Sequence, residues 1–255
     1  MVIITGAGRS GTSMVSQLLQ QFGLDFGNED ELNDLNPADQ FNERGYYEQK
    51  DVNNLNSRLI TSYPRRLNIF YTLLSRLVYT TMPNQNAVLA RAKIYSQEIR
   101  DVSKKYSKSV VKDPRFSITL PAWQLYGEFC KVLVCIRHPA EVVQSLKRAL
   151  NYPTFLGYKF WNYHNENILD NINEIKKKVL FVNFNLLSSE NFINECNNLR
   201  SFLELNLTED ELHQAYQKVF SKRLKHFDVK KHHRIPAKTA KIWDKLNELH
   251  MKQKY

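Results

Sequence analysis

The residues near the start of the chain have the types and the spacing needed to bind a phosphate-like anion. Gly6 and Gly11 enclose four residues, and Arg9 supplies a cation between them. A glycine-rich turn of this length leaves backbone N–H groups facing an anion, and a helix that begins there adds the positive end of its dipole. Nucleotide triphosphatases with this spacing carry lysine after the second glycine, whereas this chain has Thr12. The loop therefore predicts an anion site whose cation comes from within the turn.

Two more chemically suggestive groups come at the ends of apolar runs. Lys112 ends the run 109–112, and Arg137 directly follows the run 131–136. Ser145 lies eight residues after Arg137, two helical turns along, so both side chains can reach one phosphate, and an arginine fork suits its oxygens. Ligands of parallel sheets bind beyond the carboxyl ends of the strands. We therefore expect these residues and the glycine loop to converge on one site.

The elements that must position these residues alternate between strand and helix. Short apolar runs predict buried parallel strands at 2–5, 109–112, 131–136 and 179–184. Apolar spacing and capping residues predict helices at 12–22, 51–60, 113–126, from 139, and at 155–172, 189–203, 209–221 and 236–251. This alternation predicts an α/β fold, a three-layer sandwich in which helices cover both faces of a central parallel sheet.

Length and charge bound the organisation of the chain. The 255 residues are enough for one α/β domain, residues 1–255. Within it, the helical pattern of 65–106 is expected to be an insertion over the active site, and 222–255 forms a basic C-terminal segment. The net charge of +10 suits an anionic substrate, a nucleic acid or a membrane surface. There is no apolar run of about eighteen residues and no signal-peptide pattern, which predicts a cytoplasmic protein without a membrane span.

Three motifs carry a resemblance to a known family. They are Gly-Arg-Ser-Gly-Thr-Ser at 8–13, Lys112-Asp113-Pro114 after a strand, and Arg137 with Ser145. In this order they resemble the sulfotransferases that use 3′-phosphoadenosine-5′-phosphosulfate (PAPS), in their bacterial form. The resemblance implies a fold like that of the P-loop nucleotide triphosphatases, PAPS as the sulfuryl donor with 3′-phosphoadenosine-5′-phosphate (PAP) as its product, and no metal.

The same resemblance implies a role for each motif in in-line transfer of a sulfuryl group to a hydroxyl or amine. Arg9 and Lys112 would stabilise the charge that develops on the bridging oxygen. Arg137 and Ser145 would hold the 3′-phosphate. The remaining donor-binding residues, which would hold the 5′-phosphate through backbone N–H groups and a hydroxyl, are Gly8, Ser10, Gly11, Thr12 and Ser13.

The general base is less clearly marked. Animal cytosolic members of the family carry a Lys-x-His pair, with histidine as the base, where this chain has Lys112-Asp113-Pro114. In this respect the chain looks more like the protein-tyrosine sulfotransferases, which use a separate glutamate. Glu48, after a Gly-Tyr-Tyr turn, is our first choice for the base, with Glu29 and Asp30 as rivals.

Two other classes of function remain open. One is a kinase that uses ATP and Mg²⁺ on a degenerate loop, against which stand Thr12 and the absence of an acid after the run 131–136. The other is a non-catalytic binder of anions or nucleic acid through the basic tail, which would be strongly salt-dependent. We expect a small-molecule, sugar or lipid acceptor and no nucleic acid partner.

Overall fold

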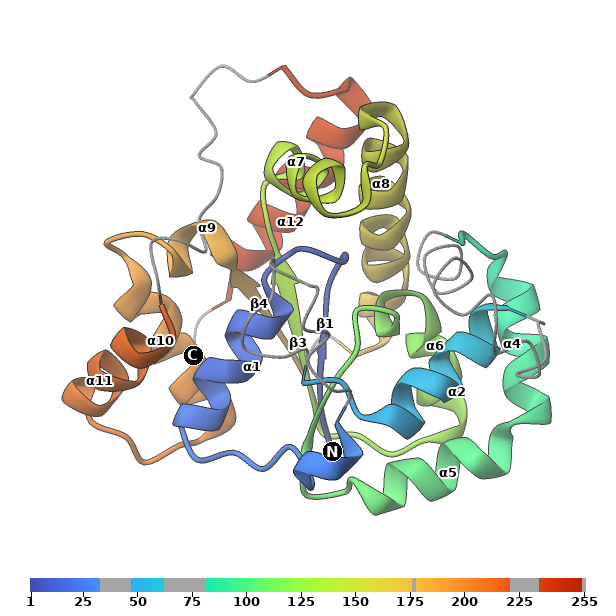
Figure 1. The fold of residues 1–255 in the computed structure, drawn as a ribbon, viewed down its shortest axis with the longest axis horizontal. Coiled ribbons are helices and arrows are strands. Elements are labelled where there is room, and N and C mark those ends of the chain that lie inside the picture. Colours follow the sequence, from blue (N-terminus) through green and yellow to red (C-terminus); the bar gives the residue numbers. More distant parts are fainter. Residues whose placement is uncertain (33–46, 62–80, 176–177, 221–233, 254–255) are drawn as a thin grey trace.

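The computed structural model describes residues 1–32, 47–61, 81–175, 178–220 and 234–253. Its centre is a sheet of four parallel strands in the order β2-β1-β3-β4 (Figure 1). The strands are β1 (Val2–Thr5), β2 (Val110–Lys112), β3 (Lys131–Ile136) and β4 (Val179–Asn183). All four strands predicted from apolar runs are thus confirmed, as is the parallel sheet.

Helices cover both faces of this sheet, which confirms the three-layer architecture (Figure 1). One face packs against α1 (Thr12–Gln21), α9 (Phe184–Leu187), α10 (Phe192–Leu203) and α11 (Glu209–Val219). The other packs against α2 (Lys50–Ile60), α4 (Gln85–Ile94), α5 (Ser96–Lys105), α6 (Phe116–Tyr126), α7 (Pro139–Leu150), α8 (Thr154–Asn171) and α12 (Ala237–Met251). Short 3₁₀ helices lie at η1 (Glu29–Glu31) and η3 (Ile172–Glu174).

The alternation of side chains along the strands explains why the helices pack on two separate cores. Alternate residues face opposite sides of a sheet, so that Ile3 and Val134 join one core while Ile4 and Leu133 join the other. All four residues are fully buried. Because both faces are covered, the strands are apolar throughout, and this is why runs rather than alternating patterns marked them in the sequence.

One predicted helix begins later than expected. The sequence placed Asp113 at the cap and Pro114 in the first turn, but α6 begins at Phe116. The backbone N–H of Asp113 still bonds across the sheet to Ile4 O at 3.2 Å, and its carboxylate accepts the N–H of Arg115 at 2.9 Å. Asp113 therefore extends the strand pairing and closes a tight turn before the helix can start.

The two segments singled out by composition are described only in part. Of the predicted insertion 65–106, residues 62–80 lie outside the described residues, while α4 and α5 pack against α2 and α6. Of the basic segment 222–255, residues 222–233 and 254–255 lie outside them, and the rest is mainly α12. Within the described ranges no helix combines the length and the apolar character needed to cross a bilayer.

Side chains satisfy the outer backbone groups of both edge strands. On β2, Gln49 Nε2 donates to Val110 O at 3.0 Å, and Gln49 Oε1 accepts the N–H of Lys112 at 3.2 Å. On β4, the N–H groups of residues 181 and 183 donate to Gln253 Oε1 and Glu195 Oε2, both at 2.8 Å. Gln49 is fully buried, and it is the residue that follows the candidate base Glu48.

Candidate active site

The loop between β1 and α1 has a backbone that requires glycine. Gly11 has φ 92°, and a Cβ there would lie 2.1 Å from a ring carbon of Phe184. Gly6 has φ 149°, and a Cβ there would lie 2.4 Å from Cys135 O. No side chain caps the N-terminus of α1, and its first turn carries no acidic residue. The first turn of α1 thus carries no carboxylate of its own that would compete for the positive end of the helix.

The predicted phosphate residues converge beside this loop. Arg9 Nε donates to Ser145 Oγ at 3.0 Å, and Arg137 Nη1 donates to the backbone oxygen of Arg9 at 3.2 Å. The guanidinium of Arg137 lies 4.3 Å from the ring centroid of Phe184, in a cation–π contact. Arg9 of the loop thus contacts both Ser145 on α7 and Arg137 at the end of β3.

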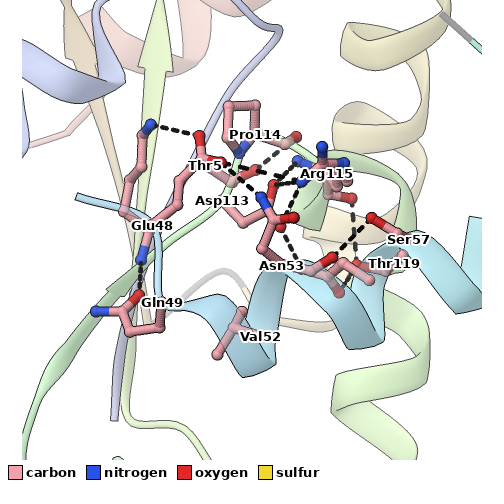
Figure 2. A network of polar contacts seen from close by, with 12 residues as sticks. Thr5, Glu48, Gln49, Val52, Asn53, Ser57, Asp113, Pro114, Arg115 and Thr119 are labelled. Carbon is pink, nitrogen blue, oxygen red and sulfur yellow. Dashed lines mark hydrogen bonds and ion pairs between the residues drawn. The ribbon is translucent and has the colours of Figure 1, made fainter. Parts of the chain in front are cut away.

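The second cation, Lys112, is paired with Glu48. Lys112 Nζ lies 2.8 Å from Glu48 Oε1, and the two side chains are 1% and 13% exposed. Glu48 Oε2 accepts Asn53 Nδ2 at 2.7 Å. Figure 2 shows Glu48 and Asn53 beside Asp113. Gln49 Oε1 accepts the backbone N–H of Lys112. Adjacent residues, Glu48 and Gln49, thus hold the side chain and the main chain of Lys112.

Comparison with known proteins identifies the family. A model of the sulfotransferase domain matches residues 1–254. The chain belongs to the sulfotransferase domain family. Among solved structures it is similar to the sulfotransferase domain of the Synechococcus PCC 7002 olefin synthase (15% identity, TM-score 0.53, 97% of this chain and 94% of that one) and to the sulfotransferase domain from the curacin biosynthetic pathway (14% identity, TM-score 0.52, 97% of each chain). No curated protein matched.

The position of Glu48 in this sulfotransferase domain depends on a strained residue before it. Tyr47 has φ 55°, in the left-handed region that side chains other than glycine seldom adopt. Its hydroxyl donates to Gln20 Oε1 at 2.9 Å, and its ring packs edge-on against Phe26 with 5.6 Å between centroids. These contacts hold the turn that directs Glu48 to Lys112.

The rivals for the base lie elsewhere. Glu29 and Asp30 are exposed on η1. The backbone oxygen of Asp30 accepts Lys50 Nζ at 2.8 Å, and no described contact joins either residue to Lys112. Of the three predicted candidates, Glu48 is the one in contact with a predicted catalytic cation.

Two opposing effects set the charge of Glu48. Burial acts to raise the pKa of Glu48, but the nearby Lys112 and Arg115, with hydrogen bonds from Lys112 and Asn53, bring it below the ordinary value of 4.5. Asp113 has the opposite outcome, because burial and the negative charge of Glu48 raise its pKa more than Arg115 lowers it. Glu48 is therefore ionised at neutral pH.

A polar network that sequence reasoning missed supports Asp113. Asn56 on α2 is fully buried, and its Nδ2 donates to Asp113 Oδ2 at 3.1 Å. Its Oδ1 accepts Thr119 Oγ1 at 2.7 Å and Trp123 Nε1 at 2.9 Å. Arg115 Nη1 lies 3.3 Å from the Asp113 carboxylate and 4.0 Å from that of Glu48. The signal in the sequence was weak, because Asn56 is one of three asparagines in α2.

The remaining predicted residues lie in the loop itself. Gly8, Ser10 and Thr12 are buried, and Gly11 and Ser13 are partly exposed. The N–H of Ser10 donates to Ala7 O at 3.0 Å, so this group already has an acceptor within the turn. Among the residues that the structure describes, no cluster of three or more His, Cys, Asp or Glu is arranged to hold a metal ion.

Proposed function

We propose that this domain transfers a sulfuryl group from PAPS to a hydroxyl or amine acceptor by in-line displacement. The observation that carries the proposal is the contact of Arg9 with Ser145 and Arg137 beside the open end of α1. PAPS bears anionic groups at its 5′ and 3′ positions, and two anion sites are needed to hold them. Membership of the sulfotransferase family supports the reaction, and a family match over residues 1–254 supports a single domain.

The residues present fit such a donor. The glycine loop gives a narrow cradle, since a Cβ at Gly11 would collide with Phe184, and the helix end above it carries no acid. Arg137 and Ser145 are expected to bind the 3′-phosphate. The N–H groups and the Thr12 hydroxyl of the loop are expected to bind the 5′-phosphate.

The bound donor supplies an activated sulfuryl group with PAP as its leaving group. In the reaction the acceptor oxygen or nitrogen bonds to sulfur while the bond from sulfur to the 5′-phosphate oxygen breaks. Lys112 and Arg9 stabilise the negative charge that grows on that oxygen. Glu48, ionised at neutral pH, takes the proton of the acceptor.

The pairing of Lys112 with Glu48 gives this mechanism a constraint. A carboxylate with a lowered pKa is a weak base, and its basicity rises when the ammonium is drawn toward another negative charge. We therefore expect Glu48 to become a better base as charge develops on the bridging oxygen and attracts Lys112.

The first test is a thermal-shift titration with PAP beside ATP with and without Mg²⁺. A ligand that binds only the folded state raises the melting temperature by mass action. We expect a saturable, metal-independent shift with PAP that is lost in Arg137→Ala. A shift with Mg·ATP and none with PAP would contradict the proposal and favour the kinase hypothesis. No shift with either would favour a binding role for the basic segment 222–255.

A further inference from the structure

We propose that Glu141 and Asn185 are positioning residues of the 3′-phosphate site, which act by holding the guanidinium of Arg137. The inference rests on the proposed function, since it assigns these residues to the donor site of that reaction. Neither residue was among the predicted site residues.

Glu141 uses both of its carboxylate oxygens inside the protein. It lies in the first turn of α7 and is 1% exposed. Its Oε2 accepts Arg137 Nε at 2.8 Å, and its Oε1 accepts Asn185 Nδ2 at 2.7 Å. A carboxylate that accepts hydrogen bonds at both oxygens is fixed in one orientation, and it therefore fixes the orientation of the guanidinium that it binds.

Asn185 uses both ends of its carboxamide. Its Nδ2 donates to Glu141, and its Oδ1 accepts the backbone N–H of His138 at 2.9 Å. Its own N–H donates to the Asn183 side chain at 3.0 Å, which fixes the residue at the end of β4. The network thus runs from the end of β4 to the start of α7 and back to Arg137 at the end of β3.

The result for Arg137 is a guanidinium held on three sides. Nε bonds to Glu141, Nη1 bonds to the backbone of Arg9, and the flat face rests on Phe184. Phe184 is the same ring that closes on Gly11. Within the part of the chain that the structure describes, Nη2 has no hydrogen-bond partner. The held arginine therefore keeps one nitrogen for an anion, beside Ser145 and the glycine loop.

Electrostatics explain why this arginine needs its carboxylate. Burial lowers the pKa of Arg137, and the nearby cations Arg9 and Arg148 lower it further, while Glu141 opposes both effects. Three arginines near one another repel, so without Glu141 the side chain of Arg137 would be free to turn toward solvent. A positioning carboxylate keeps it buried and aimed before the phosphate arrives.

The test exploits the directions of these hydrogen bonds. In Glu141→Gln the new amide presents an N–H to either Arg137 or Asn185, whichever way it is turned, and both are donors. In Asn185→Asp two carboxylates face each other. In the double variant Glu141→Gln with Asn185→Asp, the glutamine accepts from Arg137 and donates to the aspartate, which still accepts from His138. The double variant has the net charge of the wild type and restores every bond.

Binding of PAP and of adenosine 5′-monophosphate, which lacks only the 3′-phosphate, is measured by isothermal titration calorimetry. We expect each single variant to bind PAP about tenfold more weakly, as for one lost charge-assisted hydrogen bond. We expect the affinity for adenosine 5′-monophosphate to stay as in the wild type, and the double variant to recover PAP affinity. Glu248→Gln, at an exposed glutamate of α12, is the matched control and leaves both affinities unchanged.

The outcomes separate the inference from the proposed function. If the wild type does not prefer PAP over adenosine 5′-monophosphate, the proposed function fails and this inference with it. If the wild type does, but the single variants keep that preference, lose both ligands equally, or are not rescued in the double variant, the inference alone is overturned. Asn185→Ser removes one partner of Glu141 without changing charge. If Glu141→Gln fails to fold, Asn185→Ser takes its place in the test. We expect the same loss of affinity for PAP and none for adenosine 5′-monophosphate.

Discussion

Arg137 and Lys112 are both buried cations at the carboxyl edge of one sheet, and each lies 2.8 Å from a carboxylate. They differ in how much of the cation the carboxylate leaves available to a ligand. Glu141 takes one nitrogen of a planar group with five N–H donors, so Arg137 is fixed and still keeps donors for a ligand. Glu48 lies on the single ammonium nitrogen of Lys112, so the carboxylate and any ligand that reaches this lysine share one point charge.

This difference matches the two tasks of the proposed reaction. A group that is unchanged by the chemistry, such as the 3′-phosphate, is best held by a rigid cation. A group whose charge changes during the reaction needs a cation that can redistribute its interactions. The proposed reaction would therefore use a fixed arginine site for binding and a lysine–glutamate pair for chemistry, at the ends of β3 and β2, the two strands that flank β1.

The largest expected effect is on turnover when the lysine is removed. Lys112→Ala should lower kcat by about 10²–10³-fold, the usual loss for one group that stabilises transition-state charge. PAP affinity should change little, because the substitution leaves Arg137 in place. Transfer of sulfate from labelled PAPS to an acceptor found by screening measures kcat, and calorimetry measures the affinity for PAP. Lys252→Ala, at an exposed lysine, is the control. Equal losses in kcat and PAP affinity would erase the distinction between the two cations.

The matching change at the other cation should act on binding. Arg137→Ala should weaken PAP by about 100-fold, as expected for losing charge-assisted hydrogen bonds to a phosphate. Affinity for adenosine 5′-monophosphate should be retained. The control is Arg100→Ala, at an exposed arginine on α5. A parallel loss of both ligands would mean that Arg137 supports the fold rather than the 3′-phosphate.

The lysine–glutamate pair should also show in the pH dependence of stability. The pKa of Glu48 is lower in the folded protein than its ordinary value of 4.5, so its ionised form stabilises the fold above that pH. This contribution is lost as the pH falls through the folded pKa. Urea unfolding between pH 7 and pH 3.5 should show the wild type's advantage over Glu48→Gln constant at high pH and shrinking below about pH 4.5. An advantage that grows on acidification would contradict the pairing.

The smallest effect is expected far from both cations. Thr208 and Glu211 form a capping box at the start of α11, in which Thr208 Oγ1 accepts the N–H of Glu211 at 3.3 Å. Thr208→Ala should cost about 1 kcal/mol of stability, the usual value of such a cap. PAP affinity and kcat should not change. Differential scanning calorimetry measures the stability, and titration measures the affinity for PAP. A fall in that affinity would show that the donor site responds to a general loss of stability.

The strands and the loop could be predicted because their signals are local. Four apolar runs gave four strands, and the glycines at 6 and 11 marked a turn whose positive φ angles the structure confirms. The spacing of Arg137 and Ser145 predicted that both lie beside the glycine loop, and Arg9 of that loop contacts each of them. The capping box at Thr208 was visible for the same reason, since its two members are three residues apart.

The partners of these residues could not be predicted, because they come from distant parts of the chain. The contact of Glu48 with Lys112 spans 64 residues and depends on the left-handed turn at Tyr47. Phe184 meets Gly11 only because β4 ends beside the first loop. The exception is Glu141, which lies only four residues from Arg137 in the sequence.

Gln49, Gln253 and Glu195, which bond to the outer backbone of β2 and β4, have a consequence for how the protein meets other copies of itself. An edge strand with unbonded N–H groups is a template on which another chain can add a strand and begin to aggregate. Here a second chain would first have to displace Gln49 and Glu195, both buried, from the groups it needs. Three side chains thus close the sheet to extension at these positions.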